Sequence, residues 1–410
     1  MVQKHFMAPI INKKITNQFF LLCILNLPMM YLDGLISTLI GFQRFQTFYF
    51  LILFSLALVI ICYNNISIYR WLLFPFFGLC FSIICSPLNI NSFGGFTSNL
   101  QYFLRGPLLF VVLFSVLKDK ISKEHIRLFC IVTILTCTIS TIAHAVFSIG
   151  FVDKAGKLNP IYNGYLSDTN SAVFLLLLAA LTYYHLLSGA MKKFLLIIIL
   201  LFNVAALDSK AGILLIFLFL SVKFYFILFR KTNTSIVVLC TLIVVSLVAI
   251  IFFTEQIAYY VLNLVYSISI KGQSSLEFRF KTWDILTILT ATRNLKYYAL
   301  ADAFPVLESA NNFLFGNSFG IYQDNKLVES DLFDSLLALG FIGFISIYFL
   351  YLWPLYHRSK DIDIEFAVTL FVLILSVTVL VGHVFFSPAS VVGISLIASY
   401  ISKNSREKYT

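Results

Sequence analysis

Apolar runs, most of them long enough to cross a lipid bilayer as a helix, follow one another along nearly the whole chain. A bilayer core of about 30 Å needs roughly 20 apolar residues per helix. Hydrophobic residues make up 60% of the 410 residues and charged residues only 12%. A soluble domain of this size cannot hide that much apolar surface from water. The sequence therefore predicts an all-α polytopic membrane protein whose solvent is lipid.

The positions of the runs predict about twelve transmembrane helices. The runs cover residues 19–40, 45–62, 71–85, 102–117, 128–151, 172–187, 194–207, 211–229, 236–253, 332–356, 366–386 and 389–401. The first run follows Lys13 and Lys14 but lacks a small-residue cleavage site, so we interpret it as a retained helix and not as a signal peptide. The predicted organisation is helices 1–9 in residues 1–254, a large loop with interfacial helices in 255–330, and helices 10–12 with a tail in 331–410.

Lysine and arginine are unevenly divided between the two predicted sides. With a cytoplasmic N-terminus, the cytoplasmic segments contain Lys4, Lys13, Lys14, Arg70, Lys118, Lys120, Lys123, Arg127, Lys192, Lys193, Arg230, Lys231, Arg358, Lys360, Lys403, Arg406 and Lys408. The opposite short loops contain only Arg44, Lys154, Lys157 and Lys210. This asymmetry predicts that both termini are cytoplasmic and that 255–330 is a non-cytoplasmic loop. The net charge of +10 therefore indicates sidedness and not a nucleic-acid partner.

All seven cysteines fall inside apolar runs, so they are interpreted as small buried side chains, and no disulfide framework or metal site is expected. Ionisable groups near apolar runs are more informative, because each is costly at membrane depth. Arg105, near the outer end of the fourth run, is a candidate anion ligand or a side chain that snorkels to the surface. Lys210 lies in a tight outer turn before a helix start and suits an anion, or else pairs with Asp208.

The large loop and the helix after it carry the other candidates. Arg279 lies in an apolar stretch that ends at Trp283, where it can clamp a phosphate or pair with a neighbouring acid. Glu329, Asp331 and Asp334 open the tenth run. They can complement the positive end of that helix, but Asp334 lies a full turn into the apolar run, deeper than capping requires.

Several of these positions together resemble a known family. Eleven positions after Glu329 comes the pattern Gly340-Phe-Ile-Gly343. Before Glu329 comes a glycine-rich turn, Leu314-Phe-Gly-Asn-Ser-Phe-Gly320. Upstream lie Asp208-Ser-Lys-Ala-Gly212, the segment from Gly164 to Asn170, and Arg279 followed by Trp283. Their order and loop position resemble the Wzy-type polymerases of O-antigen and capsular polysaccharide and, more distantly, the WaaL O-antigen ligases. Lys210 stands where arginine is commoner in the family, and no histidine stands at Glu329, which favours polymerase over ligase.

The resemblance implies a GT-C-like architecture in the bacterial inner membrane and an inverting glycosyl transfer at the periplasmic face. A glycan on undecaprenyl diphosphate would be transferred to the sugar of a new lipid-linked repeat unit, without a nucleotide sugar, cofactor or metal. Glu329 or Asp331 would act as the base, with Arg279 as a further catalytic residue. Arg279, Lys210 and Arg105 would hold the diphosphate. Trp283, Tyr322, Asp334 and Asn170 are the candidate sugar ligands.

The implied partners are undecaprenyl-diphosphate-linked glycans, membrane lipids, and a chain-length regulator and a flippase of the same pathway. Two alternatives stay open at this point. One is a ligase that transfers glycan to lipid A core. The other is a lipid-linked oligosaccharide flippase or transporter, although such proteins place ionisable groups near the bilayer midplane and have short loops.

Overall fold

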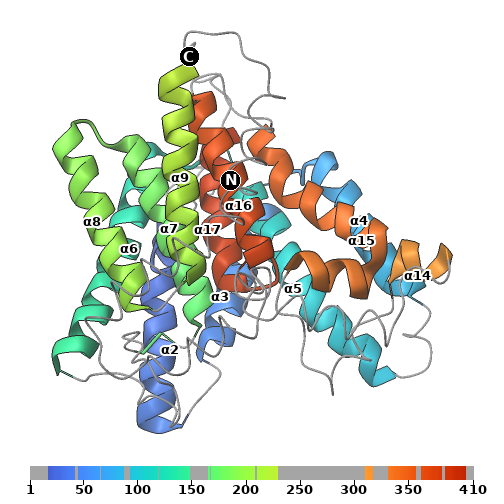
Figure 1. The fold of residues 1–410 in the computed structure, drawn as a ribbon. Helices are drawn as coiled ribbons and strands as arrows, with labels where there is room; N and C mark the ends of the chain where they lie inside the picture. The colour runs from blue at the N-terminus through green and yellow to red at the C-terminus, as the bar shows by residue number, and fades with distance from the viewer. Residues whose placement is uncertain are drawn as a thin grey trace, which may run out of the picture.

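The computed structural model describes residues 17–41, 45–64, 66–86, 93–118, 120–147, 165–166, 168–207, 210–229, 310–316, 331–356, 362–380 and 384–402. Within these ranges the regular structure is helical and contains no strand (Figure 1). The labelled helices are α2 (Asn26–Ile40), α3 (Phe45–Tyr63), α4 (Arg70–Cys85), α5 (Phe93–Leu117), α6 (Lys123–Phe147), α7 (Thr169–Leu186), α8 (Ala190–Ala206), α9 (Lys210–Phe229), α14 (Ala310–Phe315), α15 (Asp331–Tyr356), α16 (Ile364–Leu380) and α17 (Pro388–Ser402). The all-α class expected from the apolar runs is confirmed for this part of the chain.

Four of the described helices are long and apolar enough to cross a membrane: Phe45–Tyr63, Lys123–Phe147, Thr169–Leu186 and Asp334–Tyr356. A fifth span is possible if the bent pair Asn17–Ile24 and Asn26–Ile40 counts as one. Large apolar side chains are also exposed on the outside, including Phe74 at 81% and Ile40 at 77%. Such exposure fits lipid as the surroundings. A membrane-associated protein is therefore supported, whereas twelve spans and the orientation stay predictions.

Two of the predicted runs, 19–40 and 366–386, differ from the helices that form. Run 19–40 becomes two helices that meet at a bend of 62°. Run 366–386 ends as a helix at Leu380, and residues 384–386 form a turn. Run 236–253 and nearly all of the predicted loop 255–330 lie outside the described residues, except for α14 and Gly316. Hydrophobicity alone predicted the segments but not the points at which the backbone leaves the helix.

The core is built around α7 and α17, which are adjacent near the middle of the bundle in Figure 1. Nearly every residue of α17 is buried, and α17 packs against α2, α5, α6, α7 and α15. This close approach is possible because the helix carries small residues such as Ala389, Ser390, Gly393 and Ala398. Close packing matters in a membrane, because apolar surface gains nothing by moving from lipid into a bundle. A Cβ at Gly393 would lie 2.4 Å from Leu175 Cδ2.

Helix α15 is broken at Gly340, which has φ 63° and ψ −168°. Figure 1 shows its two arms meeting at a sharp bend beside α14. Gly340 and Gly316 (φ 73°) touch backbone to backbone, because a Cβ on Gly340 would lie 2.4 Å from Gly316 N. The hydroxyl of Ser82 in α4 donates to Leu339 O, a carbonyl just before the break, and Ser86 Oγ donates to Gly316 O at 3.2 Å. The predicted Gly340-x-x-Gly343 pattern thus marks a break and a close crossing.

Replacing Gly340 with alanine is expected to disrupt this crossing. A φ of 63° with ψ near 180° is essentially confined to glycine and costs an alanine about 1–3 kcal/mol, and the new Cβ would also collide with the backbone of residues 314–316. The matched control is Gly41→Ala, because Gly41 also has a positive φ of 74° but no atom near its Cβ position. Thermal unfolding in detergent should show a much larger loss for Gly340→Ala than for Gly41→Ala. Equal losses would mean that the close contact contributes nothing to stability.

Candidate functional site

Two of the predicted site residues meet at one short turn. We call residues 384–387, which connect the end of α16 to the start of α17, the anchor turn. Asp331 Oδ2 accepts a hydrogen bond from Phe385 N at 2.8 Å, and Arg105 Nε donates to Phe386 O at 3.1 Å. Their partners are consecutive residues, so the structure brings Arg105 of α5 and Asp331 of α15 to the same place.

Further side chains from three helices bond the anchor turn or the first turn of α17. Tyr351 in the second arm of α15 donates from its hydroxyl to Phe385 O at 2.7 Å. Ser171 Oγ of α7 and Ser387 Oγ lie 2.8 Å apart in a hydrogen bond. Asn26 Nδ2 of α2 donates to Ala389 O at 2.8 Å, just after the turn. Buried backbone groups need such partners, and here they come from side chains that are distant in sequence.

Gly106 allows the anchor turn to lie directly on α5. A Cβ at this position would be 2.4 Å from Phe385 O and 3.3 Å from the Tyr351 hydroxyl. The next residue, Pro107, lies inside α5 and has no backbone N–H to donate to the preceding helical turn. The sequence Arg105-Gly-Pro107 therefore combines a side chain that reaches the turn with a helix surface that the turn can touch.

The starts of α7 and α17 lie beside the anchor turn. Asp168 caps α7, accepting from Ser171 N at 3.1 Å, and Pro388 occupies the first position of α17, where a proline needs no hydrogen-bond partner for its nitrogen. The Ser171–Ser387 hydrogen bond joins these two helix starts. Helix N-termini favour anions, and the exposed side chain of Arg105 adds a full positive charge. Because Asp168 already occupies the start of α7, the groups here that favour an anion are Arg105 and the start of α17.

The acids Asp331 and Asp334 are buried. Asp331 is 0% exposed and Asp334 3%. Asp331 Oδ1 is buried without a hydrogen-bond partner. Asp331 precedes the membrane-spanning segment Asp334–Tyr356, and burial raises the pKa of its carboxyl well above the usual range, against the lowering effect of the bond from Phe385 N–H. A carboxyl with a strongly raised pKa is a poor general base at neutral pH.

In the part of the chain that the structure describes, no other predicted site residue is shown to bond the anchor turn. Asn170 is exposed in the first turn of α7, one residue before Ser171. Lys210 is the first residue of α9, but its side chain is not described. Arg279, Trp283, Tyr322 and Glu329 lie outside the described residues. In the described ranges, no group of three or more His, Cys, Asp or Glu side chains is placed to hold a metal ion.

The sequence did not point to Tyr351, Ser171, Ser387 or Asn26. Each is a neutral polar residue within or beside an apolar run, and neutral side chains are common enough there to carry no signal by themselves. Two local patterns could have helped: Ser387-Pro388 is a typical helix start, and Asp168 stands three residues before Ser171 as a cap. Neither pattern identifies the distant partner.

In comparisons with protein-family models, characterised proteins and solved structures, nothing matches this chain. The functional interpretation therefore rests on the residues and on their geometry.

Removing the Asp331 side chain should destabilise the protein, whereas changing it to asparagine should not. Asp331→Ala leaves the buried N–H of Phe385 without its acceptor, which costs about 1–3 kcal/mol. Asp331→Asn keeps an acceptor oxygen, and no ionised carboxylate is needed there if the acid is protonated. Thermal unfolding in detergent measures both. Equal destabilisation by the two variants would contradict the view that Asp331 acts chiefly as a neutral hydrogen-bond acceptor.

Proposed function

We propose that the chain is a polymerase that joins undecaprenyl-diphosphate-linked oligosaccharide repeat units into O-antigen or capsular polysaccharide. It would act at the periplasmic face of the bacterial inner membrane, as an inverting glycosyltransferase. The observation that carries the proposal is the meeting of Arg105 and Asp331 at the anchor turn, because the sequence analysis lists Arg105 as a candidate diphosphate ligand and Asp331 as a candidate catalytic acid.

The proposed glycosyl transfer needs positive charge near the leaving diphosphate and a carboxylate base near the acceptor hydroxyl. The acceptor hydroxyl attacks the anomeric carbon of the donor sugar, the bond from that carbon to the diphosphate oxygen breaks, and the proton of the hydroxyl passes to a base. Undecaprenyl diphosphate leaves with the bonding electrons, and fixed positive charge stabilises it. Arg105 and the start of α17 are proposed to supply such charge, together with Arg279 and Lys210.

Glu329 is proposed as the base, and Asp331 as the acid that positions the site. Burial raises the pKa of the Asp331 carboxyl and so favours its protonated form, although the hydrogen bond from Phe385 N–H acts in the opposite direction. Glu329 lies two residues before α15 begins. The roles of Trp283, Tyr322, Asp334 and Asn170 as sugar ligands, and the GT-C-like architecture, remain part of the proposal.

A transporter is the one alternative with an observation in its favour. Discontinuous membrane helices are typical of transporter binding sites, and α15 is discontinuous at Gly340. At this break, however, the backbone of residues 314–316 packs closely against Gly340, and Ser82 donates to Leu339 O. A ligase acting on lipid A core differs from the polymerase only in its acceptor.

The decisive experiment is reconstitution of the purified protein in liposomes with lipid-linked repeat units as the sole glycan source. A polymerase elongates these units without any nucleotide sugar, giving a ladder of longer lipid-linked glycans. Units that only change leaflet without growing would identify a transporter. Transfer to added lipid A core, with no ladder in its absence, would identify a ligase. Either result would overturn the proposal.

Arg279→Ala and Glu329→Ala should abolish long glycan chains while the protein still inserts normally. Loss of a general base typically slows a reaction about 10²–10⁴-fold, so single repeat units would stay on the lipid. Gel electrophoresis of cell-surface glycan, together with immunoblotting of membranes, measures both effects. Arg293→Ala is the matched control, because Arg293 belongs to the same predicted loop but not to the stretch that ends at Trp283. Normal ladders from both site variants would reject these assignments.

A further inference from the structure

A lysine-rich turn connects α5 to α6 at one end of the bundle. We call residues 118–122 the basic turn. Ile121 is fully buried, and its N–H donates to Leu117 O at 3.0 Å. At the start of α6, Ser122 Oγ accepts a hydrogen bond from His125 N at 3.2 Å. These contacts fix the backbone from which the lysines of the turn project.

Lys120 is a partly buried cation in the basic turn. In the part of the chain that the structure describes, no acid pairs with its ammonium group. Burial lowers the pKa of this group, because water solvates the charge less well there. A cation in such a position is stabilised when an anion approaches it.

The start of α4 brings another cation beside the basic turn. The Lys118 ammonium group lies over the Tyr69 ring, 4.0 Å from its centroid, and the Trp71 ring meets Phe114 of α5 edge-on at 5.4 Å. Arg70 stands between Tyr69 and Trp71 in the chain and is exposed. The cations of α4 and of the basic turn therefore lie near one another.

Basic residues outnumber acids in these segments. Lys123 and Arg127, one turn apart on α6, are also exposed. Residues 66–71 and 118–127 together contain five basic residues and two acids, Asp119 and Glu124. Glu124 is exposed, and Asp119 lies outside the described residues. This excess of positive charge favours an anionic ligand.

A lipid-facing stripe on α4 leads directly to Arg70. Phe74, Phe77 and Phe81 are 81%, 63% and 53% exposed. Their spacing of three and four residues, counted from Arg70, places all four side chains on one face of the helix. Large exposed apolar side chains fit lipid tails as surroundings. Arg70 therefore stands at the end of the stripe, where tails give way to headgroups.

The neighbouring helix α15 runs antiparallel to α4. A Cβ at Gly78 would lie 2.5 Å from Ser346 Oγ, and a Cβ at Gly343 would lie 2.9 Å from Ser82 Oγ. As the residue number rises along α4, the residue opposite it on α15 falls. The start of α4 and the end of α15 consequently lie at a similar level.

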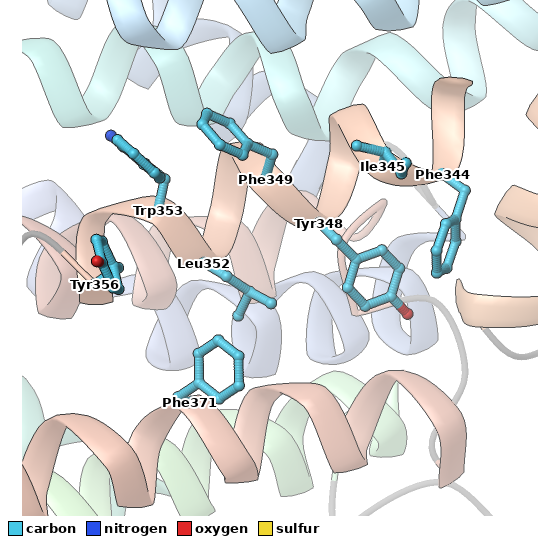
Figure 2. A pocket seen from close by; sticks show the side chains of 8 residues that line it. All are labelled: Phe344, Ile345, Tyr348, Phe349, Leu352, Trp353, Tyr356 and Phe371. Atoms are coloured by element: carbon cyan, nitrogen blue, oxygen red, sulfur yellow. The ribbon is translucent and has the colours of Figure 1, made fainter. Parts of the chain in front are cut away.

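Tryptophan and tyrosine gather at this level. Trp71 stands seven residues before Gly78, and Trp353 stands seven residues after Ser346. Trp353 stacks on Tyr356 at 5.6 Å, and Figure 2 shows both at one end of an apolar groove along α15. Such residues are enriched where a membrane meets water. The cations beside Trp71 therefore lie at the depth of lipid headgroups.

We propose that Arg70 and the basic turn bind the phosphate of an anionic phospholipid in the leaflet at this end of the bundle. A soluble anion would meet the cations but not the phenylalanine stripe, whereas a lipid meets both. A zwitterionic lipid carries a positive group beside its phosphate, which the lysines repel. The site is separate from the anchor turn, since Arg105 and Leu117 are about 18 Å apart along α5, and it does not depend on the proposed function.

Trp71 makes this preference measurable. Trp283→Phe and Trp353→Phe leave it as the sole tryptophan of the three in the chain. In phosphatidylcholine liposomes, a small fraction of phosphatidylglycerol with brominated chains should quench Trp71 several-fold more than the same fraction of phosphatidylcholine with the same chains. Equal quenching would overturn the proposal. Inorganic phosphate, matched in ionic strength with chloride, should leave the quenching unchanged; recovery of fluorescence would indicate a site for soluble phosphate instead.

A probe at the far end of α6 is the matched control. Phe147→Trp, in a background without the three native tryptophans, replaces a side chain that is 69% exposed. The two brominated lipids should quench this probe equally. A preference for phosphatidylglycerol at both probes would mean general enrichment around the protein and would reject the site.

Charge variants in the Trp71-only protein identify the ligand groups. Arg70→Gln and Lys120→Gln should each lower the preference for phosphatidylglycerol about fivefold, because each removes one cation at the membrane surface. Lys120→Arg should retain the preference, which separates loss of charge from loss of fold. Lys192→Gln is the control, since Lys192 is exposed on α8 and lies outside the basic turn. The same loss in Lys192→Gln as in Lys120→Gln would reduce the effect to net charge and overturn the proposal.

Discussion

The backbone of the anchor turn must find hydrogen-bond partners inside an apolar helix bundle, and much of the arrangement around it depends on how it does so. In surroundings without water, each unpaired backbone group costs several kcal/mol. Asp331 and Tyr351 bond Phe385, and Arg105 bonds Phe386. Because these side chains come from α5 and from both arms of α15, satisfying the turn also fixes the relative placement of those helices.

The break in α15 makes this arrangement possible. A straight helix from Asp331 to Tyr356 would extend over about 39 Å, which would keep the side chains near its two ends far apart. With Gly340 in a left-handed conformation, the first arm turns, and Asp331 and Tyr351 reach the same residue of the anchor turn. The contact between Gly316 and Gly340 holds the bend, since only glycines allow the two backbones to approach so closely. Gly316 and Gly340, two glycines of the family-like pattern, therefore have a structural role, because they allow the bend.

The sequence predicted the helical class and most segments because apolar runs of helical length have a direct physical cause. It also singled out Arg105 and Asp331, because charges beside apolar runs are costly and must have partners or a function. It could not predict that the two share one turn, since hydrogen bonds between distant residues leave no local pattern. Tyr351 and Ser171 were missed for the same reason, and the end of α16 at Leu380 was missed because hydrophobicity continues beyond it.

Charged side chains and helix starts lie close together at the anchor turn. Arg105 and Asp331 bond consecutive residues of the anchor turn, and the Ser171–Ser387 hydrogen bond brings the starts of α7 and α17 to the same place. Asp168 caps the start of α7, so this end of the helix already has an acid beside it. Burial raises the pKa of the Asp331 carboxyl, whereas the hydrogen bond from Phe385 N–H lowers it. Under the proposed function, a departing diphosphate is stabilised best when its nearest acid is neutral and the base is a different residue.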